Sequence, residues 1–142
     1  MLAGSINTSK NNVLSSQFAV MRWLSDGSVD SSFGSAGLVQ TRFSNGVDVA
    51  HAVAPQSDGR IIVAGTSSCE LNADFAVARY NGNGTLDTSF LGGNDGRTTL
   101  DFFRADDGAE NVAVQPDGKV FLGGFALDRN HVDGYALARL MP

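Results

Sequence analysis

The feature that most constrains this 142-residue chain is an internal repeat. A largely apolar hexapeptide with arginine in its fifth place occurs at 18–23, 75–80 and 135–140. A segment with the pattern Gly-x-x-Asp-x-Ser-Phe follows the first two copies. A third block, at 53–65, returns 59 residues later at 112–124. Blocks that keep one order at nearly one spacing indicate a repeat architecture, in which each unit is one supersecondary motif.

The repeat also divides the chain. Its length supports a single domain over 1–142. With a period near 59 residues, the chain holds about two and a half units, which we place at 1–48 (partial), 49–108 (complete) and 109–142 (partial). The sequence therefore predicts one repeat domain whose first and last units are incomplete.

Short runs rich in Val, Ile and Phe alternate with Asp-Gly and Asn-Gly dipeptides within each unit. Such dipeptides favour tight hairpin turns between strands. We expect about four strands per unit, for example at 49–56, 60–65, 75–80 and 97–102, and about ten strands in the chain. The more polar stretches 7–17, 66–73 and 101–110 are expected to be loops, the last one solvated. Helix is expected to be almost absent.

Side-chain alternation in the hexapeptide indicates how the strands pack. In the second copy, Phe75, Val77 and Arg79 share one face of a strand, while Ala76, Ala78 and Tyr80 share the other. A sheet with one solvated face would carry polar residues at every second position, so these strands are expected to lie between two neighbouring sheets. We therefore predict an all-β fold made of β-propeller-like blades of about four antiparallel strands, which form an incomplete ring in one chain.

The repeated text resembles the delta-60 repeat family of bacterial propeller-like proteins. The resemblance is carried by Phe-Ala-Val-Ala-Arg-Tyr at 75–80, Asn-Gly-Thr-Leu-Asp-Thr-Ser-Phe at 83–90 and Val-Gln-Pro-Asp-Gly-Lys-Val at 114–120. It implies a repeated β-sheet unit of large proteins that are often surface-associated or secreted, with no general catalytic activity.

Several charged and aromatic residues recur with the repeat. They are Arg22, Arg79, Arg139, Asp30, Asp87, Phe33 and Phe90. One hypothesis makes the arginines a ring of ligand-binding charges. We favour a structural role, in which each arginine neutralises the aspartate of its own unit and each phenylalanine packs between blades.

The sequence offers little for catalysis or metal binding. Cys69 is the single cysteine, and His51 and His131 lie far apart, so no zinc-type cluster is indicated. The oxygen-rich segments 81–87 and 128–134 lack the carboxylate offsets of a calcium loop and are expected to form ordinary Asx turns. No Gly-x-Ser-x-Gly motif occurs. We expect no catalytic, cofactor-binding or metal-binding residue, and hence no enzyme; a hydrolase that uses carboxylates such as Asp107 is a third hypothesis.

Charge and hydropathy limit the partners. The net charge of −5 disfavours nucleic acid, whose binding depends on cationic neutralisation of phosphates. The apolar stretches are far shorter than the ~20 residues that span a bilayer, and the first residues carry no signal peptide pattern. We expect a soluble chain without membrane insertion.

The unit count suggests a partner. Propellers typically have four to eight blades, so this chain holds too few to close a ring. We predict that it self-associates, with a homodimer forming a six-bladed propeller favoured over a trimer or an excised fragment. The predicted function is a non-catalytic interaction or scaffold module with a possible protein ligand; the alternative is a carbohydrate-binding propeller that places Trp23 or Tyr80 in a glycan pocket.

Overall fold

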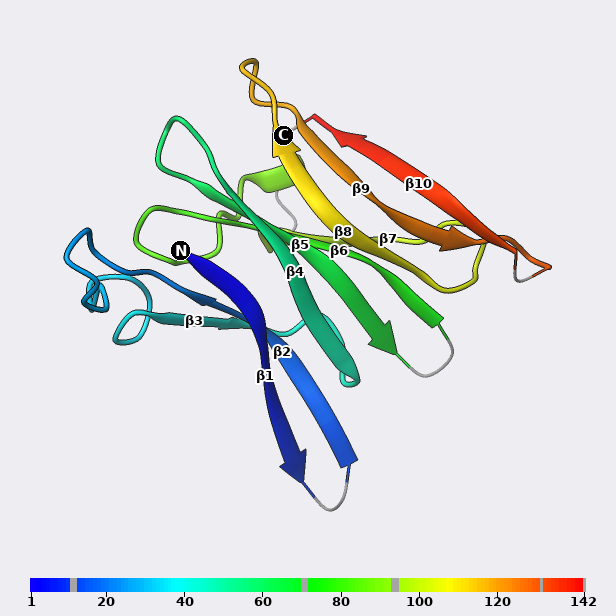
Figure 1. Ribbon diagram of the computed structural model, residues 1–142, viewed down its shortest axis with the longest axis horizontal. Helices are drawn as coiled ribbons and strands as arrows, with labels where there is room; N and C mark the ends of the chain where they lie inside the picture. The colour runs from blue at the N-terminus through cyan, green and yellow to red at the C-terminus, as the bar shows by residue number, and fades with distance from the viewer. Residues whose placement is uncertain (11–12, 70–71, 93–94, 131, 142) are drawn as a thin grey trace.

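The computed structural model describes residues 1–10, 13–69, 72–92, 95–130 and 132–141. Over these residues the chain forms ten strands and one 3-10 turn (Figure 1). They are β1 (Leu2–Lys10), β2 (Val13–Met21), β3 (Leu38–Thr41), β4 (Val47–Pro55), β5 (Ile61–Cys69), β6 (Asn72–Tyr80), η1 (Phe90–Gly92), β7 (Arg97–Leu100), β8 (Asp107–Val114), β9 (Val120–Leu127) and β10 (Asp133–Leu140). The predicted all-β class is confirmed.

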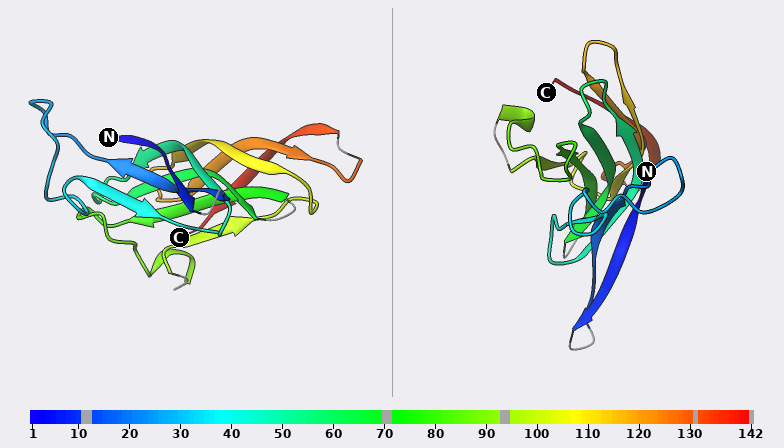
Figure 2. Two further views of the ribbon diagram at one scale, coloured as in Figure 1. Left: turned by 90° about the horizontal axis from the view of Figure 1, so that it is seen from below. Right: turned by 90° about the vertical axis from the view of Figure 1, so that its left-hand side faces the viewer.

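The strands form three antiparallel groups that follow the repeat. Blade 1 contains β1–β3, blade 2 contains β4–β7 and blade 3 contains β8–β10. One parallel bridge, between Ser16 and Val47, links the ladders of blades 1 and 2 in the part of the chain that the structure describes. The blades succeed one another across the molecule, with blade 2 between the other two (Figure 2). Among the described residues no sheet closes on itself, so the chain is an incomplete propeller.

The Asp-Gly turns join strands as the sequence predicts. At the β4–β5 turn, the amide of Gln56 donates to the carbonyl of Arg60, and the amide of Arg60 donates to the carboxylate of Asp58. Gly59 has a φ of 86° there, a conformation that glycine adopts without steric cost. The β8–β9 turn repeats this geometry 59 residues later, with Gly118 at a φ of 84°.

The core lies between blades. One cluster packs Phe18 and Val20 of blade 1 against Ala76, Ala78 and other residues of blade 2. A second cluster packs the opposite face of blade 2 against blade 3. Both faces of β6 are therefore buried, which confirms that this strand lies between neighbouring sheets.

Two expected loops are instead strands. The stretch 7–17 belongs largely to a long hairpin, in which β1 and β2 pair from Leu2 opposite Met21 to Lys10 opposite Val13. The stretch 66–73 is likewise occupied by the end of β5 and the start of β6. Both predictions were wrong for one reason: antiparallel pairing satisfies the backbone donors and acceptors whatever the side chains are, so a hairpin can extend past the apolar pattern that marks its buried part.

Candidate functional site

The recurring arginines of blades 1 and 2 contact the aspartates of their own units. The Nε of Arg22 lies 2.8 Å from a carboxylate oxygen of Asp30, and the Nε of Arg79 lies 2.8 Å from that of Asp87. Although burial acts in the opposite direction, hydrogen bonds from Ser89 and the nearby guanidinium charges hold the pKa of Asp87 below its usual value. This geometry neutralises the buried Arg79 within the protein, as a structural role requires.

Each of these arginines also covers a phenylalanine. The guanidinium of Arg22 stacks 4.6 Å from the ring centroid of Phe33, and that of Arg79 stacks 4.7 Å from Phe90. Both rings are fully buried and belong to the two clusters between blades. Arg139, the third arginine, is exposed and lies 5.9 Å from the ring of Phe121.

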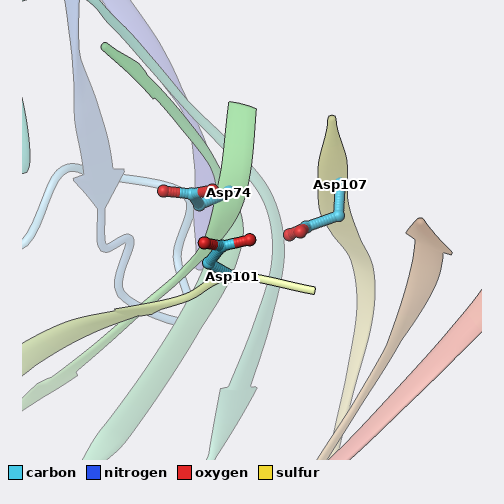
Figure 3. Close-up of side chains that lie close together, drawn as sticks. All are labelled: Asp74, Asp101 and Asp107. Atoms are coloured by element: carbon cyan, nitrogen blue, oxygen red, sulfur yellow. The ribbon is translucent and has the colours of Figure 1, made fainter. Parts of the chain in front are cut away.

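Three carboxylates meet at the junction of blades 2 and 3. Asp74 belongs to β6, Asp101 follows β7 and Asp107 begins β8, and their nearest oxygens lie within 4.8 Å of one another (Figure 3). Asp107 is fully buried. Its two carboxylate oxygens accept hydrogen bonds from the backbone amide nitrogens of Phe75, at 2.6 Å, and Phe102, at 2.7 Å.

Burial and like charge perturb this cluster. Burial raises the pKa of Asp107 to about 6, and the carboxylates of Asp74 and Asp101 add to the rise. Burial and the charges of Asp101 and Asp106 also raise the pKa of Asp74. The three side chains are close enough to share one cation, since carboxylate oxygens are the ligands that hard cations take. Asp107 accepts hydrogen bonds from two backbone amides, one in β6 and one just after β7, so this carboxyl also joins blade 3 to blade 2.

The sequence analysis missed this cluster and misplaced Asp107, which is a buried strand residue rather than part of a solvated loop. The repeat alignment carried a signal. Asp74 and Asp101 stand where the preceding unit has Gln17 and Arg42. A neutral residue and a basic residue of the first unit are thus both replaced by aspartate in the second. Both replacements lie beside the recurring aspartate, Asp107, and they indicate where the carboxylates gather.

A polar cleft of about 420 Å³ opens between blades 1 and 2. It is lined by Arg42, Phe43, Ser44, Asn45, Ser67, Asp74, Arg97 and Thr99. The guanidinium of Arg97 donates to the carbonyl of Arg42 and lies 6.0 Å from the ring of Phe43. Neither aromatic residue expected in a glycan pocket lines this cleft.

The two aromatic residues have other surroundings. Tyr80 is fully buried, its hydroxyl donates to Thr41 Oγ1 at 2.7 Å, and burial raises the pKa of Tyr80 to about 12. Trp23 is half-buried and bridges to Val29 within blade 1. Tyr80 therefore offers no face on which a sugar could stack.

The remaining candidate side chains are dispersed. His51 is exposed on β4, while His131 lies outside the described residues. The oxygen-rich segments form Asx turns: Asn83 accepts the amide of Thr85 at 3.0 Å, and Asp128 accepts the amide of Asn130 at 2.7 Å.

The outer faces of the two end blades carry exposed apolar side chains. Tyr135 of β10 is 100% exposed and Leu137 is 76% exposed, whereas their counterparts Phe75 and Val77 are fully buried. An apolar groove of about 520 Å³ runs along this face. The outer face of blade 1 carries Leu2, which is 63% exposed. These two faces are the strongest candidates for an interaction surface.

The family assignment agrees with this architecture. The sequence matches a family described as a domain of unknown function (DUF5122) β-propeller over residues 2–33, 56–90 and 115–142. No curated protein matches the chain. Within the described residues, no helix has the length and apolarity that crossing a membrane takes. The matched segments cover well over half of the chain and coincide with all three blades, so the protein belongs to the DUF5122 β-propeller family.

Proposed function

We propose that this protein is a non-catalytic interaction or scaffold module whose propeller is completed by a second copy of the chain. One observation carries the proposal: the hexapeptide face that is buried in blades 1 and 2 is bare in blade 3, where Tyr135 and Leu137 are exposed. A bare apolar sheet face on a soluble protein usually marks a binding surface, because its burial removes apolar area from water.

The number of blades supports two copies. Each chain supplies three blades, so two chains supply six, within the usual range of four to eight. Three chains would supply nine blades, which lies outside that range. The resemblance to delta-60 repeats agrees with a non-catalytic role, since that family implies no general activity.

The local contacts of the repeated residues also favour a scaffold. Arg22 and Arg79 are used to neutralise aspartates and cover phenylalanines. Asp107, the carboxyl with the most perturbed environment, has one amide donor on each oxygen. The arginine–aspartate pairs stabilise single units, and the hydrogen bonds to Asp107 join blade 3 to blade 2. Such contacts need no substrate.

Light scattering after size-exclusion chromatography tests the proposal. We expect a species of about 30 kDa at micromolar concentration, twice the 14.9 kDa of the chain. A monodisperse species of about 15 kDa that does not aggregate would contradict self-association.

Two assays address the other functions. Tyr80 is buried and cannot stack on a sugar, which weakens the carbohydrate-binding alternative. We expect no signal on a glycan array. We also expect no activity in a general hydrolase screen. An activity that disappears in Asp107→Asn, while that variant keeps its fold by circular dichroism, would show that the protein is an enzyme.

A further inference from the structure

Each blade has two different faces, and the repeat makes them comparable. The bulky face carries Phe18 and Val20 in blade 1, and the equivalent residues are Phe75 and Val77 in blade 2 and Tyr135 and Leu137 in blade 3. The small face carries the alternate residues of the same strands, which are mostly alanine. Because consecutive side chains of a strand point to opposite sides, the two faces are separate surfaces.

Within the chain, a bulky face packs on the small face of the next blade, and it does so twice. Phe18 and Val20 of blade 1 share a cluster with Ala76 and Ala78 of blade 2. The bulky face of blade 2 shares the other cluster with Ala136 of blade 3. This pairing of unlike faces is the established interface of the molecule.

Two faces have no such partner among the described residues. One is the bulky face of blade 3, with Phe125, Tyr135 and Leu137, which we name the tyrosine face. The other is the small face of blade 1, with Leu2 and Met21, which we name the leucine face. Both line apolar grooves. They are the two unmatched halves of the repeated interface.

Leu2 shows how much is missing on blade 1. Its equivalents in the other blades are Val63 and Leu122, and both are fully buried against the preceding blade. Leu2 itself is 63% exposed, and with Ala19, Met21 and Leu38 it lines an open groove of about 220 Å³. The leucine face therefore has the apolar composition of a face that is buried between blades, although it is exposed here.

On these grounds we infer that the tyrosine face of one copy binds the leucine face of a second copy, head to tail, at two equivalent contacts. The inference rests on the proposed self-association and specifies its geometry. Contacts between unlike faces form a closed ring when the rotation between copies closes. Two copies supply six blades, a number within the usual range of closed propellers.

A charged contact accompanies the apolar one. At the interface of blades 1 and 2, the guanidinium of Arg22 donates to the carbonyl of Gly82, in the turn after β6. The equivalent arginine of blade 3 is Arg139, which is exposed. The equivalent turn of blade 1 contains Asp26, also exposed, at the position of Asn83. Head-to-tail binding thus brings Arg139 beside Asp26 of the second copy, and opposite charges meet.

The test uses one variant on each face of the full chain. Leu137→Asp places a charge in the tyrosine face, and Leu2→Asp places one in the leucine face. A buried unpaired carboxylate is strongly unfavourable, so each variant alone is expected to shift from about 30 kDa to about 15 kDa. Mixed in equal amounts at tens of micromolar, they are expected to form a 1:1 complex, because each keeps the face that the other has lost. Native mass spectrometry detects this mixed species.

A matched control checks that the effect is local. Val132 is 60% exposed and lies beside β10 but outside both faces, so Val132→Asp should keep the mass of the unaltered protein. Circular dichroism and thermal unfolding establish that all three variants fold.

The outcomes separate the two proposals. A monomeric unaltered protein contradicts self-association itself. If the unaltered protein is dimeric but only one of the two face variants dissociates, like faces meet and the head-to-tail inference is wrong while self-association stands. Dissociation of neither variant, or of both without a mixed complex, also overturns the inference.

A charge exchange gives a second readout. Arg139→Glu is expected to weaken dimerisation about tenfold, and adding Asp26→Arg to the same chain should restore it. Failure of the double variant to regain affinity, with both variants folded, counts against the head-to-tail contact.

Discussion

Asp48 of blade 2 and Asp107 of blade 3 occupy the same position in successive repeats, and both are fully buried. Asp48 accepts hydrogen bonds from the Phe43 amide at 2.8 Å, from Ser44 Oγ at 3.0 Å and from Ser67 Oγ at 2.7 Å. Asp107 accepts two backbone amides instead and lies among further carboxylates.

The repeat alignment explains the difference. Ser44 and Ser67 are replaced by Phe103 and Ala126 in the next unit, so the hydroxyl donors are absent there. The backbone requires an acceptor at this position in both blades, but the neighbouring side chains decide whether a negative charge is well accommodated.

The first prediction concerns Asp48, the member of the pair whose carboxylate accepts hydrogen bonds from side-chain hydroxyls as well as from the backbone. Asp48→Ala leaves the Phe43 amide and the Ser67 hydroxyl without their acceptor, and we expect a loss of about 3 kcal/mol in the free energy of unfolding. Urea unfolding followed by the fluorescence of Trp23 measures it. The control is Asp58→Ala in the exposed turn, for which we expect less than about 1 kcal/mol. Equal losses in the two variants would contradict a special role for Asp48.

The second prediction concerns pH. The pKa of Asp107 is about 6 in the folded protein, above the 3.8 of a free side chain, so the folded state holds this proton more tightly. Its contribution to stability is complete below pH 4 and is lost as the pH rises through 6. We expect a loss on the order of 2 kcal/mol between pH 4 and pH 7.5.

The variant Asp107→Asn should lack this component of the pH profile. The aspartates with lowered pKa, such as Asp30 and Asp87, act below pH 4, outside the measured window. Urea unfolding at several pH values compares the two proteins, and an unchanged slope in the variant would assign the effect to other groups.

The third prediction exchanges the hydroxyl between blades. Ser67 pairs with Asp48 across β4 and β5, and Ala126 pairs with Asp107 across β8 and β9. We expect Ser67→Ala to lose about 1 kcal/mol and Ala126→Ser to gain about as much at pH 7.5, because the new hydroxyl can donate to Asp107. Chemical unfolding of both variants checks the opposite signs; a loss in both would show that packing at Ala126 outweighs the hydrogen bond.

The smallest expected effect belongs to the exposed neighbour. Asp101→Asn removes one charge that raises the pKa of Asp107 and keeps the acceptor for the Arg104 amide. We expect a gain of about 0.5 kcal/mol at pH 7.5 and a lower midpoint in the pH profile. Asp133→Asn, an exposed aspartate on β10, serves as the control and should leave that midpoint unchanged.

Local sequence patterns predicted much of the fold. The alternation at 75–80 predicted a strand buried on both faces, and β6 is such a strand, because strand side chains alternate strictly. The Asp-Gly pairs predicted the turns before β5 and β9, since glycine tolerates the positive φ that they need. The long β1–β2 hairpin was not predicted, because a hairpin that extends beyond the core is held by backbone pairing and needs no apolar pattern in its sequence.

The order of the repeat was enough to determine the strands that carry the apolar pattern, the turns between them and the two unlike faces of each blade, because all of these depend on residues close together in the chain. The environment of each buried carboxyl was decided only by tertiary structure. Asp74 and Asp107 are 33 residues apart and meet only when blade 3 packs on blade 2. A pKa depends on burial and on the distance between charges in space, and neither can be derived from the spacing of residues along the chain.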